Sequence, residues 1–152
     1  MEIKVREAKR QDLPGILAIY GQPDMDAGKV LSVDEAEKIF RQFQEYPFYR
    51  LYVAVAGDKT VGTFALLIMH NLAHLGKKSA LVEDVGVLPE FQGHGVGKIM
   101  MQFAMEEAKS QHCYKLALSS NAKRERAHQF YDLLGFDRHG YSFRINFPDN
   151  DQ

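Results

Sequence analysis

The chain lacks the features of a disulfide-bonded, secreted or membrane-embedded protein. Its single cysteine, Cys113, excludes an internal disulfide, and no nucleophile motif surrounds it, which disfavours a catalytic thiol. No apolar run reaches the length needed to cross a bilayer, and residues 1–4 do not begin as a secretory signal does. We therefore expect a cytoplasmic protein in a reducing compartment, with no membrane partner.

An excess of one charge is also missing. The 19 basic and 20 acidic residues give a formal net charge of −1, so no broad positive field predicts a nucleic-acid partner. The sequence shows no repeat, no low-complexity stretch and no linker. Its length is that of one well-packed domain. We predict one domain over residues 1–148 and a short C-terminal tail over 149–152.

The apolar residues follow strand-like alternation in some stretches and helical spacing in others. Asp12 is a candidate N-cap for the first helix, Ser32 and Glu35 fit a capping box at the second, and Gly135 is placed to end the last. The predicted fold class is α/β (α+β), with a mixed central sheet of about seven strands flanked by four helices. Strands are expected at 2–7, 51–56, 60–69, 80–88, 114–118, 136–138 and 141–147, and helices at about 12–20, 33–46, 96–112 and 124–134.

A glycine-rich turn between a strand and a helix, Gln92-Gly93-His94-Gly95-Val96-Gly97-Lys98, is the most informative stretch. Its alternating glycines leave backbone N–H groups uncovered where the positive end of a helix dipole begins, which suits a phosphate or pyrophosphate. The turn is not a P-loop, because Ile99 stands where Ser or Thr is required and Gln92 stands at the first glycine. Its spacing also differs from the GxGxxG of dinucleotide-binding folds.

The turn meets a third pattern in full, (Gln/Arg)-x-x-Gly-x-(Gly/Ala). A later segment, Ala127 to Phe136, carries an Ala followed by Phe-Tyr and then Gly-Phe. On these two motifs, and on the order of expected elements from Ile3 to Phe147, the chain resembles the GNAT family of acetyl-CoA-dependent N-acetyltransferases. The resemblance implies a single GNAT-like domain with acetyl-CoA (coenzyme A) as its cofactor.

The resemblance also implies which residues hold coenzyme A. The strand edge 85–87 would bind the pantetheine arm through its backbone, the N–H of Val87 would donate to the thioester carbonyl, and the glycine turn would hold the pyrophosphate. Many relatives carry an Asn where this chain has Arg124. Asn121 would then take over that contact, and Arg124 would be a phosphate contact or a surface charge. The implied cofactor-binding residues are Val85, Gly86, Val87, Gln92, Gly93, His94, Gly95, Val96, Gly97, Lys98, Asn121, Arg124, Ala127 and Tyr131.

Tyr131 matches the tyrosine that often protonates the leaving thiolate in this family, which makes it a catalytic candidate. A phenol is a suitable acid for this step, because it stays protonated near neutral pH yet can donate to a thiolate. Core packing is the alternative role for a tyrosine on an amphipathic helix. Phe130 already supplies apolar packing there, so the motif favours the catalytic role.

Glu83 and Asp84 form an acidic pair on the strand that precedes the glycine turn. The pair resembles the Glu-Asp of polyamine and glucosamine-phosphate acetyltransferases, so both are substrate-binding candidates. Adjacent strand residues point to opposite faces, so at most one is expected to face the acetyl group. We expect Glu83, which would share its face with Val85 and Val87, to be the catalytic proton acceptor, directly or through water. The alternative is a solvated or paired carboxylate within the sheet.

Two further substrate contacts are suggested. The connection 70–78 resembles the histidine-bearing segment of bacterial aminoalkylphosphonate acetyltransferases, which points to His70. The last expected strand lies near the acceptor mouth in related proteins, and its Ser142 or Arg144 could contact an anionic acceptor group. His70 and His74 have the spacing of two metal ligands on a helix, but no carboxylate accompanies them, so no metal is expected.

The predicted function is transfer of the acetyl group of acetyl-CoA directly to a primary amine of a small molecule. One alternative is acetylation of a protein N-terminus or lysine, and another is a non-catalytic acyl-CoA sensor. The acceptor and the oligomeric state stay open, although homodimers through the C-terminal strands are frequent among relatives.

Overall fold

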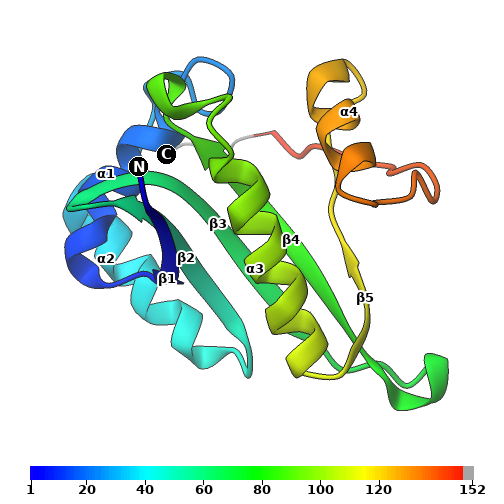
Figure 1. Cartoon of the computed structure of the whole chain (residues 1–152). Coiled ribbons are helices and arrows are strands. Elements are labelled where there is room, and N and C mark those ends of the chain that lie inside the picture. Colours follow the sequence, from blue (N-terminus) through cyan, green and yellow to red (C-terminus); the bar gives the residue numbers. More distant parts are fainter. Residues whose placement is uncertain (149–152) are drawn as a thin grey trace. The chain divides into compact units, whose positions relative to one another are not determined.

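The computed structural model describes residues 1–148, and the expected tail, 149–152, lies outside the described residues. Its contacts separate two compact units, residues 1–118 and the residues from 119 onward, and each is described by itself. The elements (Figure 1) are β1 (Ile3–Glu7), η1 (Arg10–Asp12), α1 (Leu13–Tyr20), α2 (Val33–Gln42), η2 (Phe43–Glu45), β2 (Tyr49–Ala56), β3 (Lys59–Met69), η3 (His74–Gly76), β4 (Lys78–Val87), η4 (Pro89–Phe91), α3 (Val96–Ser110), β5 (Cys113–Ala117) and α4 (Glu125–Leu133).

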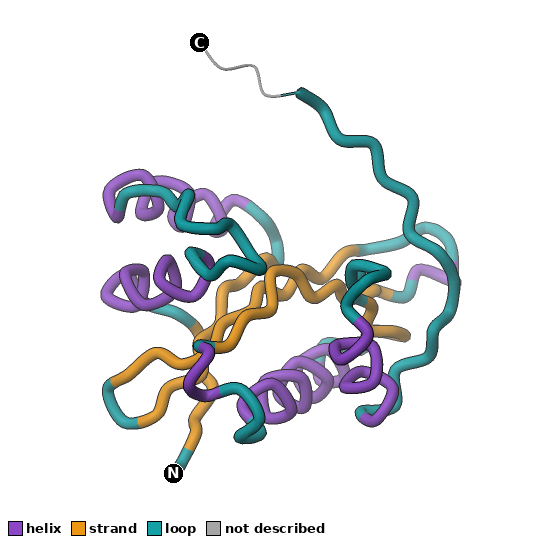
Figure 2. The backbone as a smooth tube through the Cα atoms, turned by 90° about the horizontal axis from the view of Figure 1, so that it is seen from above, coloured by secondary structure: helices purple, strands orange, loops and turns teal. Residues whose placement is uncertain are grey.

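The first unit is a three-layer arrangement around one sheet. Its strands lie in the order β1-β2-β3-β4-β5, with antiparallel pairing up to β4 and a parallel β4–β5 pair. Helices α1 and α2 cover one face, and α3, which makes the crossover between the two parallel strands, covers the other (Figure 2). The predicted mixed sheet and the four α-helices are confirmed.

Apolar side chains fill both sides of this sheet. On the α1–α2 face, Leu13 and Ile16 of α1 pack with Ala65 of β3 and neighbouring residues in one buried cluster. On the α3 face, the ring of Tyr52 stacks on Phe64 with centroids 5.1 Å apart, and Phe103 of α3 lies 5.2 Å from Tyr52. The sheet is therefore fixed from both sides, which gives β4 a rigid support.

The predicted strand count is wrong: five strands form in the described residues, and the expected strands at 136–138 and 141–147 do not. The alternation was read correctly, because Tyr141, Phe143, Ile145 and Phe147 recur at every second position. A strand nevertheless needs a neighbour to accept and donate its backbone hydrogen bonds. None of the described residues pairs with this segment.

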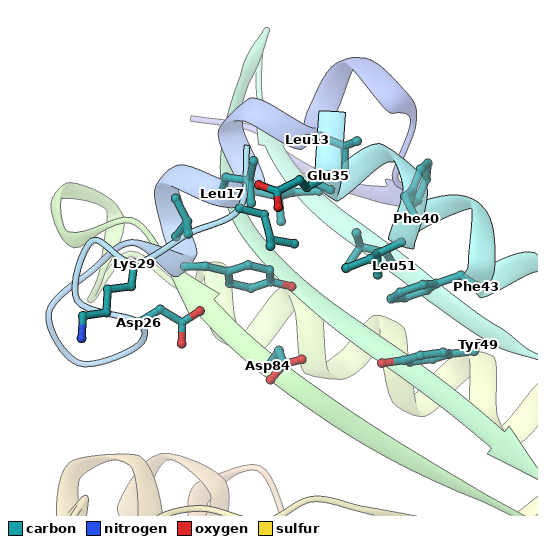
Figure 3. Close-up of a pocket in the computed structure, with 16 residues that line it drawn as sticks. Leu13, Leu17, Asp26, Lys29, Glu35, Phe40, Phe43, Tyr49, Leu51 and Asp84 are labelled. Atoms are coloured by element: carbon teal, nitrogen blue, oxygen red, sulfur yellow. The ribbon is translucent and has the colours of Figure 1, made fainter. Parts of the chain in front are cut away.

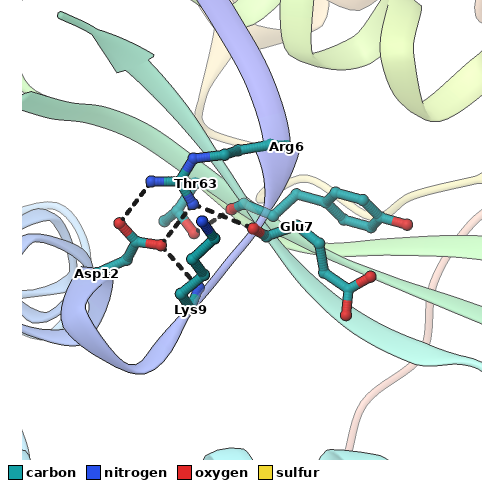
Figure 4. A network of polar contacts seen from close by, with 6 residues as sticks. Arg6, Glu7, Lys9, Asp12 and Thr63 are labelled. Atoms are coloured by element: carbon teal, nitrogen blue, oxygen red, sulfur yellow. Dashed lines mark hydrogen bonds and ion pairs between the residues drawn. The ribbon is translucent and has the colours of Figure 1, made fainter. Parts of the chain in front are cut away.

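The capping predictions have mixed outcomes. The box at α2 is confirmed, because Glu35 N donates to Ser32 Oγ at 3.2 Å and Ser32 N donates to Glu35 Oε1 at 3.0 Å. Gly135 follows α4 with a φ of +94°, as expected for a helix end. Asp12 is not a side-chain cap of α1. Its carboxylate instead accepts hydrogen bonds from both Nη atoms of Arg6, at 2.7 and 2.9 Å, and from Lys9 N at 2.7 Å (Figure 4).

None of the helices described over residues 1–148 is long and apolar enough to cross a membrane.

Candidate active site

The two parallel strands at the end of the sheet separate before β4 ends. Their last paired residues are Leu81 and Ala117, and from Val82 to Val87 the strand β4 continues beyond its pairing with β5. The segment 85–87, predicted to bind pantetheine, lies in this separated part. A strand edge of this kind presents backbone N–H and C=O groups to which an extended ligand can add as a further strand.

A β-bulge interrupts β4 at the acidic pair. Glu83 pairs with Ala65 of β3 and Gly86 pairs with Thr63. Between these two pairs, two residues of β4 lie opposite one residue of β3. The backbone of Asp84 lies in the strained left-handed region, with a φ of +55°. An extra residue in one strand reverses the alternation of side chains beyond it.

The bulge overturns the expected side-chain alternation. Glu83 lies opposite Ala65, which belongs to the cluster on the α1–α2 face, and Asp84 lines a groove on that same face. Val87 lies opposite Gly62, whose missing Cβ would meet Met100 and Val96 of α3, on the other face. Both carboxylates therefore belong to the α1–α2 side, and Glu83 does not share a face with Val87.

Two glutamines hold the end of β4. The Nε2 atoms of Gln22 and Gln92 each donate to the carbonyl oxygen of Val87 at 3.1 Å, and Gln22 also donates to the carbonyl of Ile19 at 2.9 Å. Gln22 is buried, and it ties the loop after α1 to the strand. The side chain of Gln92 thus stabilises the strand–turn junction. The sequence offered no periodic signal for Gln22, since it lies in a loop.

The glycine turn has the geometry of an anion site. Gly93 and Gly95 have φ values of +79° and +84°, and a Cβ at either position would meet no atom within 4 Å. Gly95 is the N-cap of α3 and brings no capping side chain to the helix. The N–H groups of the first turn of this 15-residue helix therefore carry the positive end of its dipole. These features fit a pyrophosphate, and the exposed side chains of His94 and Lys98 flank the same turn.

A groove of about 650 Å³ opens on the α1–α2 face of the first unit (Figure 3). Its walls come from α1, the loop 21–32, α2 and the beginning of β2, and Asp84 of the bulge lies at one side. The lining residues are Leu13, Ile16, Leu17, Tyr20, Asp26, Lys29, Val30, Leu31, Glu35, Ala36, Ile39, Phe40, Phe43, Tyr49, Leu51 and Asp84.

Acidic and phenolic groups gather around the bulge. Asp26 reaches from the loop toward Asp84, and the hydroxyl end of Tyr49 points toward Asp84 (Figure 3). Desolvation, and then the charge of Asp26, raise the pKa of the Asp84 carboxyl. Desolvation, and then the charge of Asp84, raise the pKa values of Glu83 and of the Tyr20 and Tyr49 phenols. The carboxylates therefore crowd one another, and a cation placed among them would be stabilised.

The structure does not bring His70 to this groove. It follows β3, whose last residue, Met69, pairs with Ser79 near the start of β4. At about 3.3 Å per residue, that end of the strand pair is roughly 15 Å or more from Asp84. The connection 70–77 lies at the opposite end of β4 from the glycine turn (Figure 1), and its His74 ring packs 4.6 Å from Tyr114. Over residues 1–148, no group of three or more His, Cys, Asp or Glu side chains could hold a metal ion.

The second unit holds the remaining predicted residues. Asn121 shapes the entrance to α4: its Oδ1 accepts from Lys123 N at 2.9 Å, and its carbonyl bonds to His128 Nε2 at 2.8 Å. Ala127 and Tyr131 lie on α4, and Arg124 precedes it. Ser142 bonds through its Oγ to that of Ser119 at 2.9 Å.

Tyr131 has an apolar environment within this unit. Its ring makes edge contacts with Phe130 and Phe136, at centroid distances of 5.1 and 5.6 Å. Burial raises the pKa of the Tyr131 phenol, and the nearby charge of Arg124 lowers it by a smaller amount. The phenol therefore remains protonated at neutral pH.

Residues 16–136 match the Acetyltransferase (GNAT) family, and the chain therefore belongs to it. Over 95% of this chain, the fold superposes on a putative acetyltransferase from Agrobacterium tumefaciens with a TM-score of 0.88 and 30% identity, covering 99% of that chain. The predicted family and its fold are thus confirmed.

Two curated relatives are, by name, acetyltransferases of small amines. The chain is 33% identical over 88 residues to a glucosamine 6-phosphate N-acetyltransferase of Trypanosoma brucei brucei, covering 58% of each. It is 33% identical over 95 residues to an aminoalkylphosphonate N-acetyltransferase of Salmonella typhimurium, covering 62% of this chain and 60% of that protein. The chain therefore matches about three fifths of the length of these relatives.

Proposed function

We propose that the protein is an N-acetyltransferase that moves the acetyl group of acetyl-CoA directly to a primary amine of a small molecule. One observation carries this proposal: the separated edge of β4 leads into the glycine turn, while the bulge of the same strand turns Asp84 into the groove. A backbone edge for a cofactor and an acidic groove for an amine thus adjoin on one strand. GNAT membership supports the same reaction.

The chain's own groups would supply binding and proton transfer. When bound, acetyl-CoA offers a thioester whose C–S bond breaks as the C–N bond of the amide forms. The backbone of 85–87 would bind the pantetheine arm, with Val87 N–H directed at the thioester carbonyl, and residues 92–98 would hold the pyrophosphate. Asn121, Arg124 and Ala127 of the second unit are proposed as further cofactor contacts.

The amine must lose one proton and the departing thiolate must gain one. We assign the first task to Asp84, directly or through water, because Asp84 lines the groove and the raised pKa of its carboxyl suits a proton acceptor. Glu83, the residue favoured by the sequence, would act from the same face as a second carboxylate. We assign the second task to the phenol of Tyr131. Ser142 stays a proposed substrate contact.

The test is thiol release from acetyl-CoA across a panel of primary amines. We expect Asp84→Asn to lower kcat/KM by about 100-fold, within the range of general acid–base contributions. Asp58→Asn, the same substitution in the exposed turn between β2 and β3, should leave it unchanged. Binding of acetyl-CoA without thiol release would favour the sensor alternative, and activity only on peptides or proteins would favour the protein acetyltransferase. No binding of acetyl-CoA would refute all three.

We also propose a cytoplasmic homodimer without a nucleic-acid or membrane partner. Tyr141, Phe143, Ile145 and Phe147 are between 81% and 93% exposed in the structure, and four alternating apolar side chains are a costly surface to leave in water. Light scattering should give the mass of a dimer, and Phe143→Ser should shift it toward the monomer. A monomer at every concentration would contradict the dimer.

A further inference from the structure

The walls of the groove are mainly apolar. Aliphatic and aromatic side chains of α1 and α2 face the beginning of β2 across it, among them Leu17, Phe40 and Leu51 (Figure 3). The rings of Phe43 and Tyr49 stack at one side, with centroids 4.1 Å apart and an interplanar angle of 9°. This surface can bury the carbon skeleton of a ligand, and it has few donors for the hydroxyls of a sugar.

The charged groups of the groove are three carboxylates and one ammonium: Asp26, Glu35, Asp84 and Lys29. Glu35 is already engaged in the capping box of α2, where its Oε1 accepts from Ser32 N. Lys29 points away from the Asp84 end of the groove (Figure 3). The charge that faces the interior is therefore negative, and it is concentrated at Asp26 and Asp84, beside the Tyr49 hydroxyl.

We propose that the acceptor is a primary amine with an apolar alkyl or aryl body and no anionic group. This inference rests on the proposed function and names its substrate class. The ammonium would lie among Asp26, Asp84 and the Tyr49 phenol, next to the backbone edge of β4. The carbon skeleton would lie along the apolar wall. The volume of the groove is within the range of about 300–1,000 Å³ found for small-molecule sites.

This substrate class differs from those in the names of the two curated relatives, which act on glucosamine 6-phosphate and an aminoalkylphosphonate. Both of those acceptors carry an anion as well as an amine. In this groove a phosphate or phosphonate would meet carboxylates and one outward-pointing lysine. Like charges disfavour such a ligand, and the apolar wall would leave its oxygens without donors.

The first experiment measures binding without the cofactor. Chemical shifts of the wild type are followed by NMR during titration with 2-phenylethylamine and, separately, with 2-aminoethylphosphonate. We expect 2-phenylethylamine to shift groove residues and to bind at least about tenfold more tightly, since a hydrophobic group in a pocket contributes on this scale. Equal affinity, or tighter binding of the phosphonate, would overturn the proposal.

Variants then locate the bound amine. Ile39→Ser truncates a groove side chain that is 45% exposed, and Leu75→Ser makes the same kind of change at a residue that is 95% exposed and lies outside the groove. We expect only Ile39→Ser to weaken binding of 2-phenylethylamine, by about threefold to tenfold, and Asp84→Asn to weaken it further. Equal affinities of both serine variants and the wild type would contradict a groove site.

Turnover separates this inference from the function on which it rests. A kcat/KM for 2-phenylethylamine above that for glucosamine 6-phosphate and 2-aminoethylphosphonate supports both. The opposite order overturns the substrate class and leaves acetyl transfer standing. Amine binding in the groove without any thiol release overturns the function and leaves the ligand class standing. Groove shifts that depend on protein concentration, and not on added amine, would mean that a second copy covers the groove, which also overturns the proposal.

Discussion

Gly86 packs against α1 close to the candidate site. Replacing it with alanine is therefore expected to change both the stability of the first unit and the binding of the amine. The residue lies on β4 two positions after Asp84, with its missing Cβ directed at α1. An added Cβ would approach Ile19 Cγ2 to 2.6 Å and Met25 Sδ to 2.9 Å. Ile19 is fully buried, so it has no solvent into which it can move. Helix α1 or strand β4 must therefore shift.

The expected loss of stability follows from two opposed effects. Overpacking of a core by one carbon costs about 1–3 kcal/mol. Alanine also restricts the unfolded chain, which stabilises the fold by about 0.4–1 kcal/mol where the backbone conformation permits it. We therefore expect Gly86→Ala to lower the free energy of unfolding by about 1–2 kcal/mol. The shift of α1 should also raise KM for the amine, because Leu17 and Tyr20 of this helix line the groove.

Urea denaturation and steady-state kinetics measure these effects, with Gly140→Ala as the matched control. A Cβ at Gly140 would meet no atom within 4 Å, and its φ is not in the left-handed region. Gly140→Ala restricts the unfolded chain as Gly86→Ala does, but its added Cβ makes no contact in the fold. If both variants have equal stability within about 0.5 kcal/mol, the proposed contact between Gly86 and α1 is refuted, since surface substitutions vary by that amount.

Three further predictions concern single side chains. Asp12→Asn should cost about 2 kcal/mol at neutral pH, because it weakens charge-assisted hydrogen bonds to a half-exposed Arg6. Bonding to Arg6 lowers the pKa of Asp12 in the fold. The stability that Asp12 contributes is therefore complete above the unfolded pKa of about 3.9 and is lost as pH falls through the folded value. Equal urea midpoints of the variant and the wild type at pH 7 would contradict this contribution. Tyr131→Phe should lower kcat by about 100-fold, a larger effect than any loss of acetyl-CoA affinity measured by calorimetry, and an unchanged kcat excludes a catalytic phenol. Gly95→Ala should cost about 1 kcal/mol in urea from backbone strain alone, since the site has room for the Cβ, and a neutral result would contradict the left-handed N-cap.

Local sequence patterns were enough to predict most of the fold. Alternation and helical spacing are properties of a few neighbouring residues, so β3 and α3 were predicted to within a few residues at each end. The strand expected at 141–147 shows the limit of this reasoning. Its alternation is present in the sequence, but strand formation depends on a partner that the pattern does not specify.

The candidate site was harder to predict than the fold. The glycine turn was found because its residues are adjacent in the sequence, and its left-handed glycines follow from their type. Asp84 was named as a substrate-binding candidate, but the face of Glu83 was predicted wrongly, because the bulge depends on how β4 pairs with β3, and a slip of one residue exchanges the faces. Asp26 and Gln22 were missed because a loop residue acquires neighbours only when the chain folds.

The two proposed ligands use different parts of one strand, and this has a consequence for specificity. The cofactor would bind the backbone edge of β4 and the N–H groups of the glycine turn, which most side-chain substitutions leave intact. The amine would bind the face of β4, where Asp84 and the walls of α1 and α2 are side-chain features. The acceptor site can therefore change while the cofactor site is kept. If the amine binds as proposed, this separation accounts for how a chain that is 33% identical to two small-amine acetyltransferases over part of its length can accept a different amine.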